Sequence, residues 1–138
     1  MTFPLARDYM ATKLHTLHPK MDIREAVPLL LDNNISGAPV VDKETGELVG
    51  ILSELDCLKL MTTGDDIPRG HVEDYMSREV ETISPDMDIF WVAGKFLSCQ
   101  FRRFPVVEDG VLIGQISRRD VLRAIQINIE KELLNQDE

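Results

Sequence analysis

The stretch GILSELDCL, Gly50–Leu58, reappears sixty-four positions later as GQISRRDVL, Gly114–Leu122. Both copies place a glycine three residues before a Ser-x-x-Asp motif and a leucine two residues after its aspartate. Serine followed by an acidic residue three positions on is typical of a helix start, where the two side chains cap backbone N–H groups. A helix start can also hold an anionic ligand. The motif alone therefore leaves a structural cap and a small-molecule site as alternatives.

The repeat extends over most of the chain. Aligning Asp8–Leu58 with Asp74–Leu122, with Glu44 and Thr45 as an insertion in the first copy, gives 18 identities in 49 pairs. Such self-similarity predicts two copies of one structural unit. A unit of about sixty residues is only marginally stable alone. We therefore expect the two copies to pack against each other, and interfaces between domains are a favoured place for ligand clefts.

The hydrophobic period changes within each copy and predicts the order β-α-β-β-α, a fold of the α/β (α+β) class. We expect a short first strand at 14–16 and at 80–83. The first helix of each copy is predicted at 23–33 and at 89–100. Two apolar runs joined by a turn follow, and the last helix of each copy begins at the Ser-x-x-Asp motif.

Local signals refine these elements. Asp22 occupies a predicted N-cap, and Glu25 three residues on completes a capping-box pattern. Pro28 lies beyond the first turn of the same helix, so we expect that helix to be bent or to start late. In the second copy, Asp109-Gly110 lies between two apolar runs, which favours a two-residue hairpin with positive φ at both positions.

Composition and charge restrict the kind of partner. The chain has 138 residues, is 43% hydrophobic, and contains no apolar run long enough to span a membrane. Fifteen basic and 24 acidic residues give a net charge of -9, the wrong sign for general attraction to nucleic acid or an anionic membrane. Cys57 and Cys99 fit neither a disulfide framework nor a Cys-x-x-Cys site. We expect a cytoplasmic protein with no nucleic-acid and no membrane partner.

Several ordered motifs occur twice. The first copy contains T-x-x-P, ISGAPVVD and GILSELD, and the second contains T-x-S-P, RRFPVVEDG and LIGQISRRD. Together they resemble a tandem pair of cystathionine-β-synthase (CBS) domains, the arrangement called a Bateman module, over about residues 6–127. The organisation expected is CBS domain 1 at 6–61, a linker at 62–73, CBS domain 2 at 74–127 and a C-terminal helix extension at 128–138. The two units are expected to form a pseudo-symmetric pair.

The resemblance implies a regulatory module that binds adenosine-containing ligands in clefts between the two copies. In this family the motif aspartate typically contacts ribose and the serine or threonine reaches phosphate. This assigns Asp56 and Asp120 to ribose and Ser53 and Ser117 to phosphate. The other candidates are the threonine that closes each first strand and the segment that starts each hairpin. They are Thr16, Gly37, Ala38, Pro39 and Val40 in the first copy, and Thr82, Arg102, Arg103, Phe104, Pro105 and Val106 in the second.

The two candidate sites differ in charge. Arg102 and Arg103 precede the second hairpin, and hydrogen bonds from arginine to phosphate are strong, so we expect the second copy to be the better phosphate site. Arg118 and Arg119 belong to the first helical turn and are expected to face water. Glu54 lies beside the first motif, which should disfavour highly charged phosphates. The first site is therefore expected to accept a neutral or cationic compound such as S-adenosylmethionine, or nothing.

The expected regulatory ligand is AMP, ADP, ATP or S-adenosylmethionine, with no required cofactor. His15 and His18 fall on a predicted strand without a nearby acidic or cysteine ligand, so no metal site is predicted. The sequence has no nucleophile elbow, no Walker loop and no base beside either cysteine, so no catalytic residue and no enzyme activity are predicted.

The rival interpretation is a ligand-free interaction or dimerisation module. CBS pairs often associate into disc-like dimers, so a homodimer is expected in either case. The last helix carries an apolar stripe that could contact a second copy: Leu122, Ile125, Ile129 and Leu133. The effector protein that such a module would regulate is expected to be a separate chain, and the sequence does not identify it.

Overall fold

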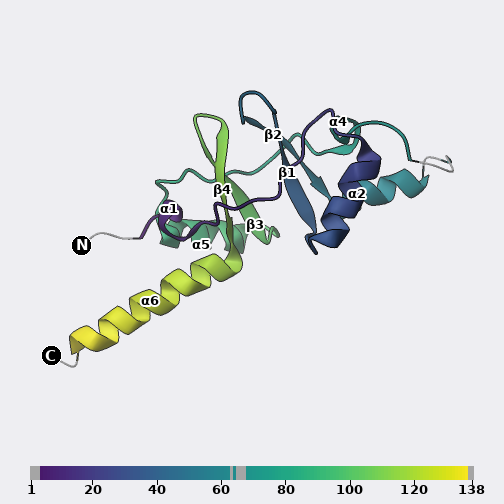
Figure 1. Cartoon of the computed structure of the whole chain (residues 1–138). Coiled ribbons are helices and arrows are strands. Elements are labelled where there is room, and N and C mark those ends of the chain that lie inside the picture. The colour runs from purple at the N-terminus through teal and green to yellow at the C-terminus, as the bar shows by residue number, and fades with distance from the viewer. Residues whose placement is uncertain (1–3, 63, 65–67, 137–138) are drawn as a thin grey trace. The chain divides into compact units, whose positions relative to one another are not determined.

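The computed structural model describes residues 4–62, 64 and 68–136 (Figure 1). These residues form two compact units. One unit takes in the chain up to Leu14, Glu81–Asp109 and the chain from Ile113 onward. The other is built from His15–Val80 together with Gly110–Leu112. Each unit therefore contains most of one sequence repeat and a short piece of the other.

The unit that holds the first repeat has a two-stranded antiparallel sheet with helices before and after it. Its elements are α2 (Ile23–Asp32), β1 (Gly37–Val41), β2 (Leu48–Ser53), α3 (Glu54–Leu58), the 3-10 helix η1 (Lys59–Thr62) and α4 (Val72–Tyr75). The predicted linker lies partly outside the described residues, and its last two residues already belong to α4.

The unit that holds the second repeat also has a helix, two strands and a second helix in that order, but its short helix comes first in the chain instead of last. Its elements are α1 (Ala6–Tyr9), α5 (Ile89–Ser98), β3 (Arg103–Glu108), β4 (Val111–Ser117) and α6 (Arg118–Gln136), the long helix near the C-terminus in Figure 1. The predicted helices and hairpins are confirmed. The predicted first strands are reduced to one parallel bridge each, Leu17 with Val40 and Ile83 with Val106, and Leu17 lies just beyond the predicted range.

Helix starts and turns follow the local signals with two differences, both in α2. The Asp22 carboxylate caps α2 by accepting from the Arg24 backbone N–H at 2.8 Å, so the capping box predicted with Glu25 is wrong. The helix begins at Ile23, directly after this cap, so of the bend or late start predicted from Pro28 the late start is also wrong. The cap and the burial of Ile23 hold the first turn in place ahead of the proline.

The two-residue turn of the second hairpin is confirmed. Asp109 has φ of 52° and Gly110 has φ of 83°, as a type I′ turn requires.

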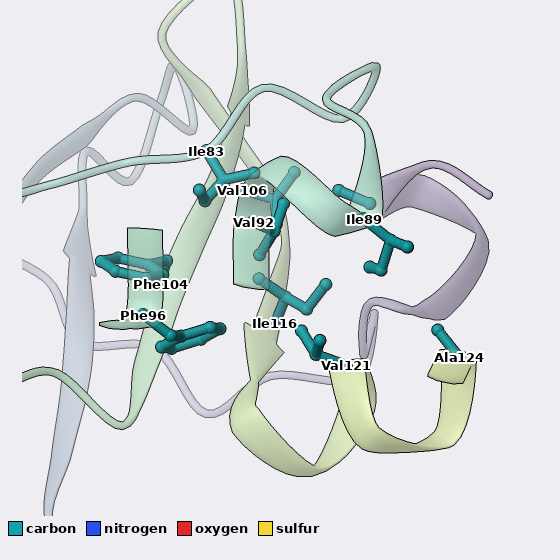
Figure 2. Close-up of a cluster of buried hydrophobic side chains, with 10 residues drawn as sticks. Ile83, Ile89, Val92, Phe96, Phe104, Val106, Ile116, Val121 and Ala124 are labelled. Atoms are coloured by element: carbon teal, nitrogen blue, oxygen red, sulfur yellow. The ribbon is translucent and has the colours of Figure 1, made fainter. Parts of the chain in front are cut away.

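Each unit has its own hydrophobic core. In the unit that holds the second repeat, the ring centroids of Phe96 on α5 and Phe104 on β3 lie 4.5 Å apart. Figure 2 shows both rings beside the aliphatic side chains of the same cluster. This cluster consists of Ala6, Ile83, Ile89, Val92, Phe96, Phe104, Val106, Ile116, Val121 and Ala124. The first-copy cluster consists of Leu17, Ile23, Ala26, Leu30, Ala38, Val40, Leu52, Leu60, Val72 and Met76.

The two short helices α1 and α4 are exchanged between the repeats. In α1, the Ala6 N–H donates to the Met87 carbonyl at 2.8 Å, in the loop before α5. In α4, the Val72 N–H donates to the Met21 carbonyl at 2.9 Å, in the loop before α2. Ala6 and Val72 are both fully buried. Each repeat is therefore completed by the helix that precedes the other repeat in sequence.

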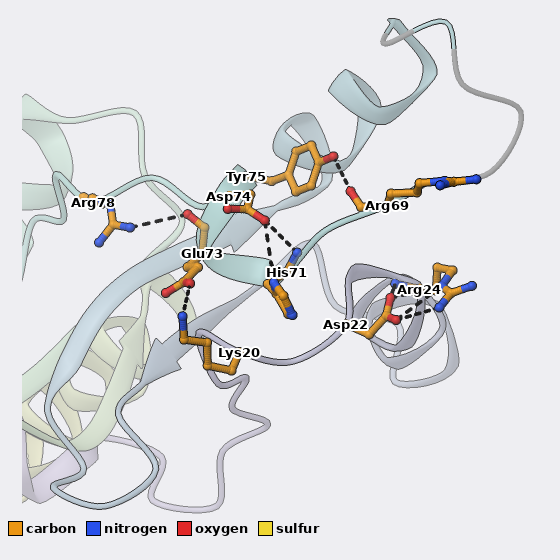
Figure 3. Close-up of polar contacts among 9 residues, drawn as sticks. All are labelled: Lys20, Asp22, Arg24, Arg69, His71, Glu73, Asp74, Tyr75 and Arg78. Carbon is orange, nitrogen blue, oxygen red and sulfur yellow. Dashed lines mark hydrogen bonds and ion pairs between the residues drawn. The ribbon is translucent and has the colours of Figure 1, made fainter.

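Polar contacts hold α4 against the loop before α2 (Figure 3). The Lys20 ammonium donates to the Glu73 carboxylate at 2.7 Å. The Tyr75 hydroxyl donates to the Arg69 carbonyl at 2.6 Å, which closes the segment that leads into α4. The Ile23 N–H also donates to the Gly70 carbonyl at 3.0 Å, so the residues that lead into α4 are held beside the start of α2.

The exchange explains the repeated glycine of the opening motif. A Cβ on Gly114 would lie 2.5 Å from the Met10 sulfur and 3.0 Å from the Ala11 carbonyl oxygen. A Cβ on Gly50 would lie 2.7 Å from the Met76 sulfur. These glycines admit the chain that follows the exchanged helix.

Replacing Gly114 by alanine should lower the free energy of unfolding by about 1–3 kcal/mol, because the new methyl group overlaps Met10 and a backbone oxygen. Gly94→Ala is the matched control, since a Cβ there meets nothing within 4 Å and the position lies inside α5. This control should raise stability by up to about 1 kcal/mol. Urea unfolding measures both variants, and equal stabilities would contradict the close packing at Gly114.

The Arg24 guanidinium beside Asp22 lowers the pKa of that carboxyl to about 2 from 3.8. A depressed folded-state pKa contributes stability above the unfolded value, and this contribution is lost as the pH falls from about 4 toward 2. Asn also caps helices well, so Asp22→Asn removes the charge and keeps the cap. Thermal unfolding should show wild type more stable than Asp22→Asn at pH 5 and the difference shrinking by pH 2. A difference that stays constant with pH would contradict this.

Candidate functional site

The Ser-x-x-Asp motifs stand at the same structural position in the two units. Ser53 ends β2 and is the N-cap of α3, and Ser117 ends β4 directly before α6. Backbone hydrogen bonds tie both helix starts to the segment before the preceding hairpin. The Glu54 N–H donates to the carbonyl of residue 36 at 2.9 Å, and the Arg118 N–H donates to the carbonyl of residue 102 at 3.2 Å. Each motif therefore lies beside the start of its own hairpin.

Both motifs form complete capping boxes. The Ser53 backbone N–H donates to Asp56 Oδ2 at 2.9 Å, and the Asp56 N–H donates to Ser53 Oγ at 3.2 Å. The corresponding distances for Ser117 and Asp120 are 2.8 and 3.2 Å. The capping interpretation of the repeated motif is therefore confirmed, and any ligand role is additional to it.

The serine hydroxyls are also engaged. Ser53 Oγ–H donates to Asp56 Oδ2 at 3.0 Å, and Ser117 Oγ–H donates to Asp120 Oδ2 at 2.9 Å. A hydroxyl has one hydrogen to donate. The phosphate contact expected of these serines therefore requires the hydroxyl to rotate away from the aspartate.

The second oxygen of each aspartate lies outside the cap and accepts from a basic residue three positions later. Lys59 Nζ donates to Asp56 Oδ1 at 3.3 Å, and Arg123 Nη2 donates to Asp120 Oδ1. Asp56 Oδ1 also accepts from the Ser77 hydroxyl at 3.4 Å. The aspartates are 5% and 6% exposed, so these contacts neutralise charges that are almost out of water.

These partners were not among the residues predicted from the sequence. The spacing Asp-x-x-Lys or Asp-x-x-Arg occurs in both copies, and residues three apart on a helix are neighbours, so Lys59 and Arg123 could have been found. Ser77 could not, because it follows α4 and reaches Asp56 through the exchange of helices.

The segments that start the hairpins divide into core and surface. Four predicted site residues belong to the hydrophobic clusters, where their side chains pack against helices: Ala38, Val40, Phe104 and Val106. Pro39 and Pro105 are also buried. Gly37 is half-buried and is the strand partner of Ser53. A ligand could therefore meet these segments mainly through their backbone and through position 37 or its counterpart Arg103.

The predicted threonines precede the bridges that replace the first strands. Thr16 and Thr82 are half-buried and directly precede Leu17 and Ile83. The Thr82 carbonyl accepts from Lys95 Nζ at 3.0 Å.

The arginines of the second copy differ in their surroundings. Arg118 is exposed, as predicted, but its Nε donates to the Phe101 carbonyl at 3.1 Å, so it is tied to the loop before β3. Arg119 is exposed, as predicted. Arg102 is exposed and Arg103 is half-buried at the start of β3. Arg103 is therefore the first residue of β3, as Gly37 is the first residue of β1, and Gly37 pairs with the motif serine of the first copy.

In the described part of the chain, Cys57, the possible metal ligands and the length of the helices bear on other functions. Burial raises the pKa of the Cys57 thiol, which makes it a poorer nucleophile. Within residues 4–62, 64 and 68–136, no three His, Cys, Asp or Glu side chains gather as they would around a metal ion. No helix among these residues is long and apolar enough to cross a membrane.

The CBS domain family model matches residues 6–63 and again 72–127. The chain belongs to the CBS-domain family and carries two copies of the domain. It is 36% identical over 126 residues to the A-adding tRNA nucleotidyltransferase of Aquifex aeolicus, a match that covers 91% of this chain and 15% of that protein.

Two solved structures are similar over nearly their whole length. CBSX2 in complex with AMP has a TM-score of 0.78 and 31% identity, with 90% of this chain and 98% of that chain covered. The CBS domain pair of protein MJ0100 in complex with 5′-methylthioadenosine and S-adenosyl-L-methionine has a TM-score of 0.73 and 29% identity, covering 92% and 99%.

Ser117→Ala should lower the free energy of unfolding by about 1 kcal/mol, because the Asp120 N–H loses its acceptor and the carboxylate loses a donor. Ser36→Ala, at an exposed loop residue, should stay within about 0.5 kcal/mol of wild type. Urea unfolding monitored by circular dichroism measures both. A Ser117→Ala variant as stable as wild type would contradict the capping role.

Proposed function

We propose that this chain is a regulatory module that binds an adenosine-containing ligand of the AMP, ADP or ATP class and acts on a separate effector protein. One observation carries the proposal: the similarity to AMP-bound CBSX2, at 31% identity over 90% of this chain. The MJ0100 pair, which binds 5′-methylthioadenosine and S-adenosyl-L-methionine, supports the same ligand class. The proposal includes no catalytic residue and no required cofactor.

The second copy is the proposed phosphate-binding site. Asp120 would accept from the ribose hydroxyls, and Ser117 and Arg103 would contact phosphate. Of Arg102 and Arg103, Arg103 is the better placed, because it is the first residue of β3. Its counterpart in the first copy, Gly37, pairs with the motif serine. The segment 103–106 would line the base, largely through backbone and apolar atoms, and Thr82 would supply a further polar contact.

The first copy would hold a less charged ligand or none. Asp56 would accept from ribose, beside Thr16, Ser53 and the strand 37–40. Glu54 is exposed next to the motif and would repel phosphate. S-adenosylmethionine, which carries a positive sulfonium, suits such a site better than ATP does.

A ligand-free dimerisation module is the second candidate. The capping boxes are complete without a ligand, and large apolar side chains are exposed on both units, including Leu31 at 74% and Leu97 at 89%. Apolar surface of this kind is typical of an interaction site. A homodimer is compatible with either candidate.

Isothermal titration calorimetry with AMP, ADP, ATP and S-adenosylmethionine tests the proposal. Wild type should bind at least one of them, and Arg103→Gln should weaken ATP binding by about tenfold or more, since a hydrogen bond from arginine to phosphate contributes about 1.5–3 kcal/mol. Arg119→Gln removes the same charge from an exposed residue and should change binding by less than twofold.

The alternative predicts a different result. A chain that binds none of these compounds, and whose thermal stability none of them raises, would favour the dimerisation module, because any ligand of the folded state must stabilise it.

A further inference from the structure

Hydrogen-bond capacity limits what the motif aspartates can accept. An ionised carboxylate offers about four acceptor positions, two on each oxygen. In both copies the two positions on Oδ2 are taken by the backbone N–H and the hydroxyl of the motif serine. A ribose diol that donates to Asp56 or Asp120 must therefore use Oδ1.

Oδ1 is already occupied in both copies. Within the described residues, Asp56 Oδ1 accepts from Lys59 and Ser77, which fills its two positions. Among the described residues Asp120 Oδ1 accepts only from Arg123, which leaves one position. The difference arises because Ala11, which has no hydroxyl, stands in the second-copy unit where Ser77 stands in the first, each in a backbone bridge with the strand before the motif.

We infer that Arg123 and Lys59 compete with the ligand: each occupies the aspartate oxygen that would accept from ribose, and we call these two cations latches. A ligand binds only when its sugar hydroxyls displace the latches from Asp120 and Asp56. The inference rests on the function proposed above and adds a specificity-determining residue to each site. The same contact, at the same spacing, occurs in both copies of the repeat.

Burial makes the exchange between cation and sugar possible. The Asp120 side chain is 8% exposed and the Arg123 side chain is 63% exposed, so the arginine lies on the solvent side of the pair. The values for Asp56 and Lys59 are 7% and 65%. An exposed cation can leave for water at little cost, whereas a buried carboxylate needs a partner at all times. The sugar hydroxyls provide that partner when the cation leaves.

The two latches differ in strength. Release of Arg123 leaves both acceptor positions on Asp120 Oδ1 free, so the two hydroxyls of a ribose cis-diol can both donate to it. Release of Lys59 leaves Ser77 on Asp56 Oδ1, so only one position becomes free. The second copy is thus the better ribose site, because more acceptor positions become free on its aspartate. This reason does not depend on the arginines that are proposed to contact phosphate.

Adenosine is the probe for this inference, because it has the diol and no phosphate. In calorimetric titrations, Arg123→Met should bind adenosine about three- to tenfold more tightly than wild type, since the ligand-free carboxylate loses its competing partner. Lys59→Met should give a smaller increase, because Ser77 remains. Arg119→Met removes the same charge from α6 and should leave adenosine affinity within twofold of wild type.

A salt titration of adenosine binding is the second measurement. Raising the ionic strength from about 0.05 to about 0.5 M screens the exposed cation. Wild-type affinity for adenosine should therefore rise with salt, and Arg123→Met should show a smaller response. Unchanged or weaker adenosine binding by Arg123→Met, while wild type binds, would overturn the latch and leave the proposed function intact. If neither wild type nor Arg123→Met bound adenosine or any adenine nucleotide, the proposed function and the latch would both be overturned.

Discussion

The structure depends on a reciprocal exchange of two short helices. The Ala6 N–H bonds the Met87 carbonyl, and the Val72 N–H bonds the Met21 carbonyl, each at a loop that belongs to the other repeat. Both donor residues are fully buried, so removing either helix would expose apolar surface and leave backbone groups unpaired. Neither repeat is complete with its own residues alone, because each core is closed by a helix from the other.

The exchange also determines the surroundings of the Ser-x-x-Asp motifs. Gly50 and Gly114 are glycine because the chain after the exchanged helix passes against them. The same chain brings Ser77 to Asp56, whereas the equivalent residue beside Asp120 is Ala11. A duplicated motif thus acquires two different environments, and the two carboxylates are chemically unequal although their caps are alike.

Much of the fold could be predicted because its signals are local. The turn at Asp109-Gly110 needs only its own two residues, and the capping boxes need only residues three apart. The predicted capping role of Glu25 failed, because the Asp22 carboxylate bonds the backbone and guanidinium of Arg24 instead. Among the candidate site residues, Ala38 and Phe104 proved to be core, since adjacent strand residues face opposite sides and the pattern alone did not say which side held the helices.

The sequence by itself determined that the chain repeats one unit that resembles a CBS domain and where its hairpins and main helices lie, and it left a helix cap and a ligand site as alternatives for each motif. These features depend on near neighbours and on a repeat that is visible in the letters. Only the tertiary structure decided which short helix completes which repeat, why the motif glycines are needed, and that Lys59, Ser77 and Arg123 surround the aspartates in unequal sets. The reason is physical: which distant segment fills a core depends on complementary packing across the fold, and no local pattern encodes that pairing.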